Sequence, residues 1–346
     1  MMNKIKNKIE KELAIYIRNL GKSYHLKKIS PVLLRHIREF LLRKGKRIRP
    51  CLFVVGYLGF CKKIAPGLYR SAVSLELLHD FMLVHDDIID KSDTRRGKPS
   101  MHAMLNKFLS RYRKIKFSGQ DLTIVIGDVI YALALDAFLS IKEELRRKED
   151  ALRKLIAAAL ATGSGEFIEL LYSTTPIGKI KKPDIYKIYD LKTANYTFAA
   201  PLAIGATLAG AGESDLDKLF DYGIYVGRAF QIRDDIIGMF NEEKETGKSN
   251  LSDLREAKKT LLIWYAYNNS TQGDRIVIRK ILSGSNTGKD ELLKMREIAL
   301  RSGALDFARR QITNSLNKAE GLLRGSRMDK KYKELLSRYS QKILRL

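Results

Sequence analysis

The chain has 346 residues, of which 45% are hydrophobic and 30% are charged, a composition that excludes a disordered or membrane-embedded class. Basic residues exceed acidic residues by 64 to 39, and the resulting net charge of +25 leaves binding to nucleic acid or to another polyanion open. Cys51 and Cys61 are the only cysteines, too few for a disulfide framework, and residues 1–10 lack the apolar core of a signal peptide. We therefore expect a cytoplasmic protein.

Apolar residues recur at intervals of three and four along almost the whole chain, which predicts an all-α fold. Prolines fall at several of the inferred junctions. The expected helices cover about residues 3–19, 30–43, 50–61, 66–90, 100–112, 120–146, 149–173, 183–210, 213–241, 256–268, 273–283, 288–302, 304–324 and 329–345. Long helices with short connections indicate a single bundle domain over residues 1–346. The apolar stretches 122–141 and 197–212 are too interrupted or too short to predict a membrane span.

The first candidate site lies at the end of the expected helix 66–90. Steps of three and four residues place on one face His79, Met82, Asp86 and Asp90. Asp86 and Asp90 then lie about 6 Å apart along the helix axis, a spacing at which carboxylates can share divalent cations with diphosphate oxygens. A solvated acidic helix end would look similar, but the basic segment 93–99 follows and offers guanidinium groups for phosphate. The motif therefore predicts a combined cation and anion site.

The second candidate site lies on the expected helix 213–241. Gln231, Asp234 and Gly238 continue the apolar face, so we expect Asp234 on the buried side, where a carboxylate needs a metal or a hydrogen bond. Gly238 stands where a further carboxylate would complete the motif, so this site should offer fewer ligands than the first. The glycine- and lysine-bearing loop 246–260 follows and can cover phosphates and exclude water.

Six motifs, in this order, resemble those of the trans-prenyl diphosphate synthases, the polyprenyl synthetase family, and most of all archaeal short-chain geranylgeranyl diphosphate synthases. They are GKRIRP at 45–50, the segment from Leu77 to His102, Gly127-Asp128, Lys192-Thr193, FQIRDD at 230–235 and the loop 247–260. Together they span about residues 40–262, and their number and order make the resemblance specific.

The resemblance implies an isoprenoid synthase fold, in which a large helical bundle surrounds a central cavity, usually in a homodimer. It implies condensation of isopentenyl diphosphate with dimethylallyl, geranyl or farnesyl diphosphate, mainly to geranylgeranyl diphosphate. A farnesyl or bifunctional synthase is the alternative. Three Mg²⁺ ions, which Mn²⁺ could replace, would be held by Asp86, Asp90 and Asp234, with Asp87 and Asp235 in support.

The resemblance also assigns roles to the remaining polar residues. The expected contacts of the allylic diphosphate are Arg95, Lys192, Lys248 and Lys258. The expected contacts of isopentenyl diphosphate are Gly45, Lys46, Arg49, His79 and Arg96. Thr193 and Gln231 would face the developing carbocation. Ala257 stands where the family often has glycine, which leaves open whether Lys258 or Lys259 takes the role of the loop lysine.

Phe81 and Met82 are the expected chain-length residues. Phe81 precedes Asp86 by five residues, or about 7.5 Å along the helix axis, and a ring there could form the cavity floor or simply pack in the core. Among rival functions, a class I terpene cyclase would not need the two basic boxes, and a nucleic-acid-binding role rests on the net charge alone. The basic segment 324–345 predicts a solvated helix face, or at most a peripheral membrane contact.

Overall fold

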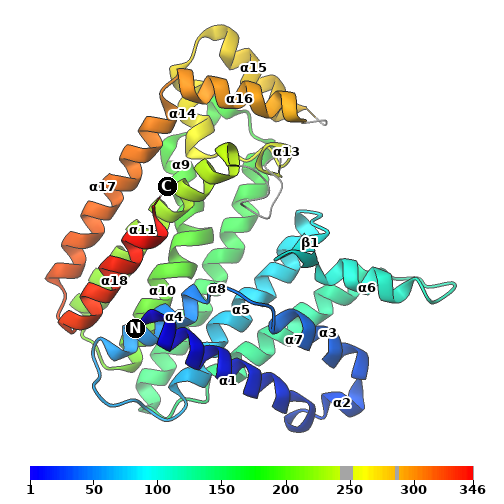
Figure 1. Ribbon diagram of the computed structural model, residues 1–346, viewed down its shortest axis with the longest axis vertical. Coiled ribbons are helices and arrows are strands. Elements are labelled where there is room, and N and C mark those ends of the chain that lie inside the picture. The colour runs from blue at the N-terminus through cyan, green and yellow to red at the C-terminus, as the bar shows by residue number, and fades with distance from the viewer. Residues whose placement is uncertain (242–251, 285–287, 346) are drawn as a thin grey trace. The chain divides into compact units, whose positions relative to one another are not determined.

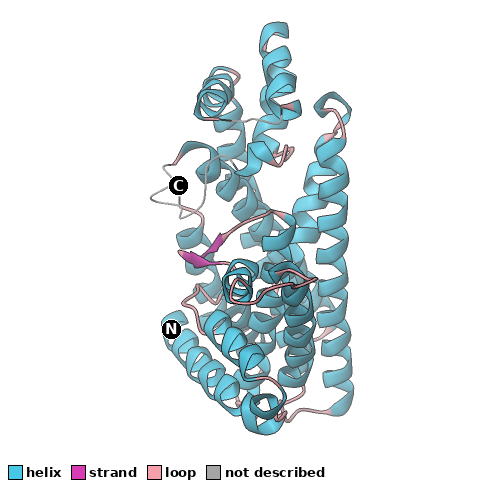
Figure 2. Cartoon of the chain, turned by 90° about the vertical axis from the view of Figure 1, so that its right-hand side faces the viewer, coloured by secondary structure: helices cyan, strands magenta, loops and turns pink. Residues whose placement is uncertain are grey.

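The computed structural model describes residues 1–241, 252–284 and 288–345 (Figure 1). Helices dominate these ranges, and Figure 2 shows a single small hairpin of strands among them, formed by β1 (Thr94–Arg95) and β2 (Lys98–Pro99). The all-α prediction is confirmed. The chain divides into two compact units, residues 1–152 with 204–210 and residues 153–203 with 211–346. The single domain that the sequence predicts stays a prediction.

The first unit is built around a helix that is buried on most sides, α5 (Leu68–Ile89). It packs against α7 (Gly119–Phe138), α4 (Ile48–Leu58) and α1 (Met2–Ser23). The unit also contains α2 (Leu26–Ile29), α3 (Pro31–Leu41), α6 (Met101–Leu109), the hairpin, the start of α8 (Leu145–Thr174) and the end of α10 (Ala200–Leu208). Because α5 is central, it buries three acidic side chains, those of Glu76, Asp80 and Asp87.

The second unit is built around α11 (Glu213–Phe240), which packs against α17 (Ala304–Gly325) and the π-helix η2 (Tyr189–Ala199). Gly223 and Gly227 allow the approach to η2, because a Cβ on either would lie 2.3 Å from the Cα of Ala199 or Ala194. The other elements are the rest of α8, η1 (Ile177–Lys179), α9 (Lys182–Ile188), the start of α10, α13 (Ser252–Arg255), α14 (Leu261–Asn269), α15 (Gln272–Ser283), α16 (Lys289–Arg301) and α18 (Lys330–Ile343).

Three features differ from the sequence prediction. The expected helix 183–210 is divided into α9, the π-helix and α10, and a π-helix cannot be recognised from a period of 3.6 residues. The hairpin was not predicted, because its two-residue strands are too short to show alternation. The short helices α2 and α13 were not predicted either, since four residues give no periodic pattern.

Among the described residues, one helix is long and apolar enough to cross a membrane by length and composition. This helix is α8, with a mean hydropathy of 1.3 over its most apolar 18 residues, of which 17% are buried inside the protein. The sequence prediction did not select this segment. Length and composition alone do not distinguish a surface covered by lipid from one covered by another protein chain.

Candidate active site

The three carboxylates of the first acidic motif, at the end of α5, differ in exposure. Asp87 is buried, whereas Asp86 and Asp90 are partly exposed. The Asp87 carboxylate accepts a 2.6 Å hydrogen bond from Nε of Arg95, and Nη2 of Arg95 lies 3.5 Å from Asp86. Burial raises the pKa of Asp87, and the charge of Arg95 opposes that rise. Asp87 therefore anchors Arg95, while Asp86 and Asp90 are the carboxylates accessible to a ligand.

The hairpin that follows α5 presents the two arginines of the basic segment. Arg96 and Gly97 have φ angles of 55° and 71°, both positive, as a tight two-residue hairpin turn of type I′ requires. A positive φ is costly for arginine, and ion pairs hold it in place. Nη2 of Arg96 lies 3.4 Å from Oε1 of Glu76 and 3.4 Å from Oδ1 of Asp80. The hairpin thus joins Arg95 and Arg96 to carboxylates of α5.

Glu76 also binds Arg47, whose side chain is fully buried. Arg47 pairs with Glu10 at 2.9 Å and donates a 2.6 Å hydrogen bond to the Arg43 carbonyl. Burial alone would lower the pKa of Arg47, but Glu76 and Glu10 raise it above its ordinary value. A Cβ on Gly45 would lie 3.1 Å from Nη1 of Arg47, so glycine leaves room for this group. Glu76 therefore bridges two guanidinium groups.

The residues expected to hold isopentenyl diphosphate belong to the same unit. Lys46 is exposed and Arg49 is partly exposed. The pKa of His79 is held well below its ordinary value by burial and then by the charges of Arg49 and Arg96, so its imidazole is neutral at pH 7. The charges of Arg49 and Arg96 thus act on His79, and the binding of isopentenyl diphosphate by these residues stays a prediction.

Phe81 lies in an aromatic cluster between α5 and α7. Its ring centroid is 4.8 Å from that of His85 and 5.1 Å from that of Tyr131. Gly127 admits His85 against α7, because a Cβ at this position would lie 2.1 Å from Cε1 of His85. Phe81 and Met82 both remain partly exposed. Phe81 is therefore held firmly on two sides without being enclosed in the core.

The second motif differs from the prediction in which aspartate is buried. The Asp234 side chain is 44% exposed and lies 3.4 Å from Nη1 of Arg233, whereas Asp235 is buried at 6% exposure. The expectation of a buried Asp234 is therefore wrong, because the helix turns Asp235 towards η2. There Asp235 accepts hydrogen bonds from Gln231, at 2.9 Å, and from the hydroxyl of Tyr189. Thr193 donates to Gln231 at 2.7 Å, so the structure brings the predicted Thr193 and Gln231 together.

Lys192, on the π-helix, binds two carboxylates of α8. Its Nζ lies 2.5 Å from Oε2 of Glu166 and 2.5 Å from Oε2 of Glu169. Gly165 allows this approach, because a Cβ there would lie 2.9 Å from the Lys192 backbone nitrogen. The two carboxylates face Lys192 from one side of α8, as residues three apart on a helix do.

The loop lysines have different environments. Nζ of Lys258 lies 2.6 Å from Glu256, while Nζ of the buried Lys259 donates to the carbonyls of Ser173, at 2.6 Å, and Ala257, at 2.7 Å. Burial lowers the pKa of Lys259 to about 8. Ala257 has a φ of 52°, which explains why glycine suits this position. Lys258 is therefore the more accessible lysine. The predicted Lys248 lies outside the described residues.

A model of the polyprenyl synthetase family matches residues 30–299. The chain belongs to this family. It is a prenyltransferase, a short-chain trans-prenyl diphosphate synthase. It is 34% identical over 300 residues to the geranylfarnesyl diphosphate synthase of Aeropyrum pernix, covering 85% of this chain and 87% of that protein. It is 31% identical over 266 residues to the geranylgeranyl diphosphate synthase of Sulfolobus acidocaldarius, covering 76% of this chain and 75% of that one.

Solved structures show the same fold. The geranylgeranyl pyrophosphate synthase of Corynebacterium glutamicum, complexed with isoprenyl diphosphate and magnesium, superposes with a TM-score of 0.89 at 26% identity over 99% of both chains. The synthetase of Pyrococcus horikoshii superposes with a TM-score of 0.82 at 24% identity over 99% of both. The isoprenoid synthase fold is therefore confirmed for this polyprenyl synthetase.

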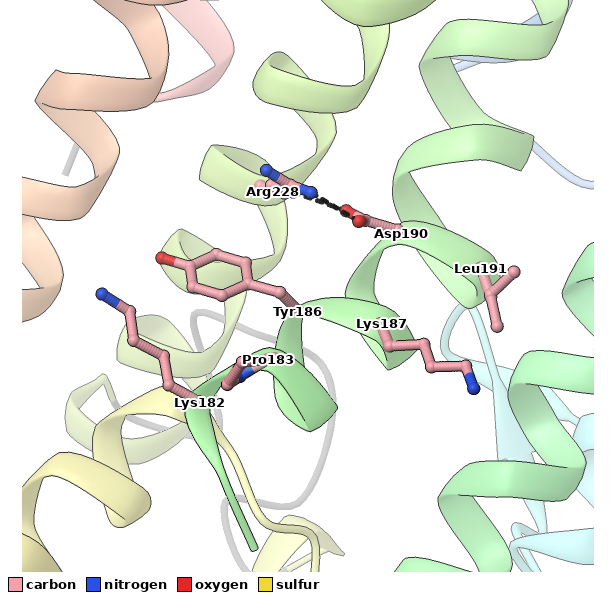
Figure 3. Close-up of a pocket in the computed structure, with 7 residues that line it drawn as sticks. All are labelled: Lys182, Pro183, Tyr186, Lys187, Asp190, Leu191 and Arg228. Carbon is pink, nitrogen blue, oxygen red and sulfur yellow. Dashed lines mark hydrogen bonds and ion pairs between the residues drawn. The ribbon is translucent and has the colours of Figure 1, made fainter.

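The synthase also has a surface pocket of about 540 Å³ at α9, the π-helix and α11 (Figure 3). Arg228 crosses it to make a two-pronged ion pair with Asp190, with Nε and Nη2 at 2.6 and 2.5 Å from the carboxylate oxygens. Nζ of Lys182 lies 5.6 Å from the centre of the Tyr186 ring. No residue predicted for the active site lines this pocket, and two of its cations already face an acid or a ring.

Sequence reasoning missed several residues that hold the synthase site. Glu76 and Asp80 carry a detectable signal, because two acids one turn apart lie within the largely apolar stretch 71–84 of α5. Glu166 and Glu169 carry a weaker one, at a spacing of three within an apolar segment. Tyr189 carries none, since a tyrosine before a basic motif is indistinguishable from an ordinary core residue.

Proposed function

We propose that this synthase condenses isopentenyl diphosphate with dimethylallyl, geranyl and farnesyl diphosphates in a Mg²⁺-dependent reaction that ends at geranylgeranyl diphosphate. The end of α5 carries the proposal, because Asp86 and Asp90 are accessible while Asp87 fixes Arg95 beside them. Carboxylates and a guanidinium group in one place suit a cation-bound diphosphate. The named activities of the Sulfolobus acidocaldarius and Corynebacterium glutamicum relatives support the same assignment.

The donor set fits Mg²⁺, which prefers hard oxygen ligands. Asp86 and Asp90 would hold it in the first unit, and the 44% exposed Asp234 would do so in the second. Bound there, Mg²⁺ or Mn²⁺ would neutralise the diphosphate and make it a better leaving group. Asp235 is a poorer ligand, because both its oxygens already accept hydrogen bonds from Gln231 and Tyr189.

The chain's own residues would bind and orient the two substrates. Arg95 offers charge to the allylic diphosphate, and Arg96, with Arg49 and Lys46, offers it to isopentenyl diphosphate. A neutral His79 can donate a hydrogen bond to that second diphosphate without adding repulsion among the arginines. These basic groups for a second substrate favour a condensing synthase over a class I terpene cyclase, which ionises one substrate only.

The activity can be tested directly. The protein is incubated with MgCl₂, isopentenyl diphosphate and each allylic diphosphate in turn, and the dephosphorylated products are separated by chromatography. We expect a C20 product from all three primers. Accumulation of C15 would assign the farnesyl alternative, and absence of condensation with every primer would refute the proposed function.

We propose that the Phe81 ring sets the length of the product. Its contacts with His85 and Tyr131 hold it one and a half turns before Asp86, where a growing chain would meet it. Phe81→Ala should therefore yield products longer than those of the wild type in the chromatographic assay. Phe108→Ala, which removes a partly exposed ring on α6, is the matched control and should leave product length unchanged. An unchanged product-length profile for Phe81→Ala would show that the Phe81 ring does not form the floor of the cavity.

We propose that the exposed apolar face of α8 is covered by a second copy of the chain. Its members, in steps close to one or two helical turns, are Ile156, Leu160, Phe167 and Leu171, at 45, 71, 64 and 53% exposure. Gly163 lies on the same face with open space around it, which would let another helix come close. The two acids of the segment turn to Lys192, which keeps this face apolar.

Sedimentation velocity tests this assembly. The wild type should sediment as a dimer of the 39.5 kDa chain, and Leu160→Lys should shift it towards the monomer. Ile276→Lys, at another apolar position that is 53% exposed, should leave the dimer intact. A wild-type monomer at micromolar concentration would refute the dimer, and flotation of the wild type with neutral vesicles would assign the face to lipid.

A further inference from the structure

A continuous chain of hydrogen bonds joins the π-helix, α11 and α14 in the second unit. The backbone N–H of Leu261 donates to the hydroxyl of Tyr189 at 2.9 Å, and that hydroxyl donates to Oδ2 of Asp235. Nε2 of Gln231 donates to Oδ1 of Asp235 at 2.9 Å, and Oγ1 of Thr193 donates to Oε1 of Gln231 at 2.7 Å. The chain therefore runs from the first residue of α14 to a residue expected at the reacting carbon.

The chemistry of these groups gives the chain one direction. An ionised carboxylate only accepts hydrogen bonds, so Gln231 must turn its NH₂ group towards Asp235. Its carbonyl oxygen then faces Thr193 and takes the hydroxyl hydrogen. Thr193 is left with its lone pairs, the part of a hydroxyl that stabilises a positive charge. The orientation of the Thr193 hydroxyl is therefore set by Asp235, which is two hydrogen bonds away through Gln231.

Tyr189 fixes the far side of Asp235. The ring is buried at 4% exposure, and its hydroxyl lies between the backbone N–H of Leu261 and Oδ2 of Asp235. Its own acceptor site is taken by Leu261, which leaves the hydrogen for Asp235. Leu261 directly follows the stretch that contains Lys258 and Lys259, so Tyr189 also ties the base of the lysine loop to α11.

We propose that Tyr189 is a positioning residue for prenyl transfer. Acting through Asp235, it fixes the amide of Gln231 and so the direction in which Thr193 presents its oxygen to the allylic cation. The inference rests on the proposed function, because Thr193 and Gln231 have this role only if an allylic cation forms beside them. It also makes Asp235 an orienting carboxylate and leaves the metal to Asp234.

The test compares two tyrosine-to-phenylalanine variants under steady-state conditions. Tyr189→Phe should lower kcat by about 10- to 100-fold, the range typical when an outer-shell hydrogen bond is removed, with KM for isopentenyl diphosphate within about twofold. Tyr222→Phe is the control, because Tyr222 is equally buried on α11 and its hydroxyl bonds Ser340 at 2.5 Å. It should keep the wild-type kcat. A wild-type kcat in Tyr189→Phe overturns the proposal.

A second variant covers the case in which Tyr189→Phe does not fold, as circular dichroism would show. Asp235→Asn replaces one of the two accepting oxygens by an NH₂ group, so either Tyr189 or Gln231 loses the oxygen that it now bonds, and kcat should fall by a similar factor. In the double variant the losses should not add, because both act on one path. An unchanged kcat in Asp235→Asn, or additive losses, contradicts the inference.

The Mg²⁺ dependence separates positioning from metal binding. Both variants should reach half their maximal rate at the same Mg²⁺ concentration as the wild type. If that concentration rose tenfold or more, Asp235 would be a metal ligand and the proposal would be overturned. An inactive wild type would refute the proposed function itself. An active wild type with an unaffected Tyr189→Phe variant would refute the positioning role alone.

Discussion

Glu76→Gln replaces one carboxylate oxygen by an amide group, yet it should destabilise the protein strongly, because it removes a charge shared by two arginines. The Arg47 side chain is 0% exposed and that of Glu76 is 3% exposed, so their attraction is not screened by water. Breaking a buried pair costs about 3–5 kcal/mol. Arg47 keeps Glu10, which places the expected loss at the lower end, about 3 kcal/mol.

Urea unfolding followed by circular dichroism measures this loss. The control is Glu334→Gln, since Glu334 pairs with Arg338 at 3.5 Å with side chains 50 and 80% exposed, and such surface pairs contribute less than about 1 kcal/mol. We also expect a higher KM for isopentenyl diphosphate, because Arg96 loses one of its two anchors. A stability loss as small as that of the control would show that Glu76 does not hold Arg47.

Three further predictions concern stability and are checked by the same unfolding experiment. Asp80 is buried without a hydrogen bond to either oxygen, and burial, followed by the charge of Glu76, raises its pKa well above 3.8. The folded chain therefore keeps a proton that the unfolded chain has lost, so Asp80→Asn should become more stable relative to the wild type as the pH rises above about 4. An equal difference in stability between variant and wild type at pH 5 and pH 8 would contradict this. Ala257→Gly should stabilise by about 0.5 kcal/mol, because relief of the positive φ exceeds the entropy of glycine in the unfolded chain; a loss would refute it. The pKa of Lys259 is lowered from 10.5 to about 8 by burial. Between these pH values the unfolded chain binds more protons than the folded chain, so the free energy of unfolding should rise with pH, by at most about 3 kcal/mol. Lys259→Met should lack this rise.

The sequence predicted the helical class, the family and most helix positions, because those depend on periodicity and on motifs that are local in the chain. It predicted that Asp86 and Asp90 share one face, since residues four apart on a helix do, and both are partly exposed. Their role as metal ligands stays a prediction. It failed at Asp234 and Asp235. Adjacent residues on a helix differ in direction by about 100°, and a small error in the expected apolar face exchanges their environments.

The remaining differences have one physical cause, which is packing between segments distant in the chain. Glu76 on α5 pairs with both Arg47, just before α4, and Arg96 in the hairpin, and no local sequence pattern connects these segments. The π-helix lies close against Gly223 and Gly227 of α11, a contact that its own local sequence does not reveal. Such features become visible only when the elements are placed together.

The contact of Lys192 with Glu166 and Glu169 affects how this lysine should be studied. The formal charges of these three residues sum to −1, although the whole chain carries +25. A diphosphate would be repelled by the two glutamates as well as attracted by the lysine, until cations arrive with it. Replacing Lys192 by alanine would remove the proposed diphosphate contact and also leave two carboxylates against each other. The variant that isolates the contact is therefore Lys192→Ala combined with Glu166→Gln and Glu169→Gln.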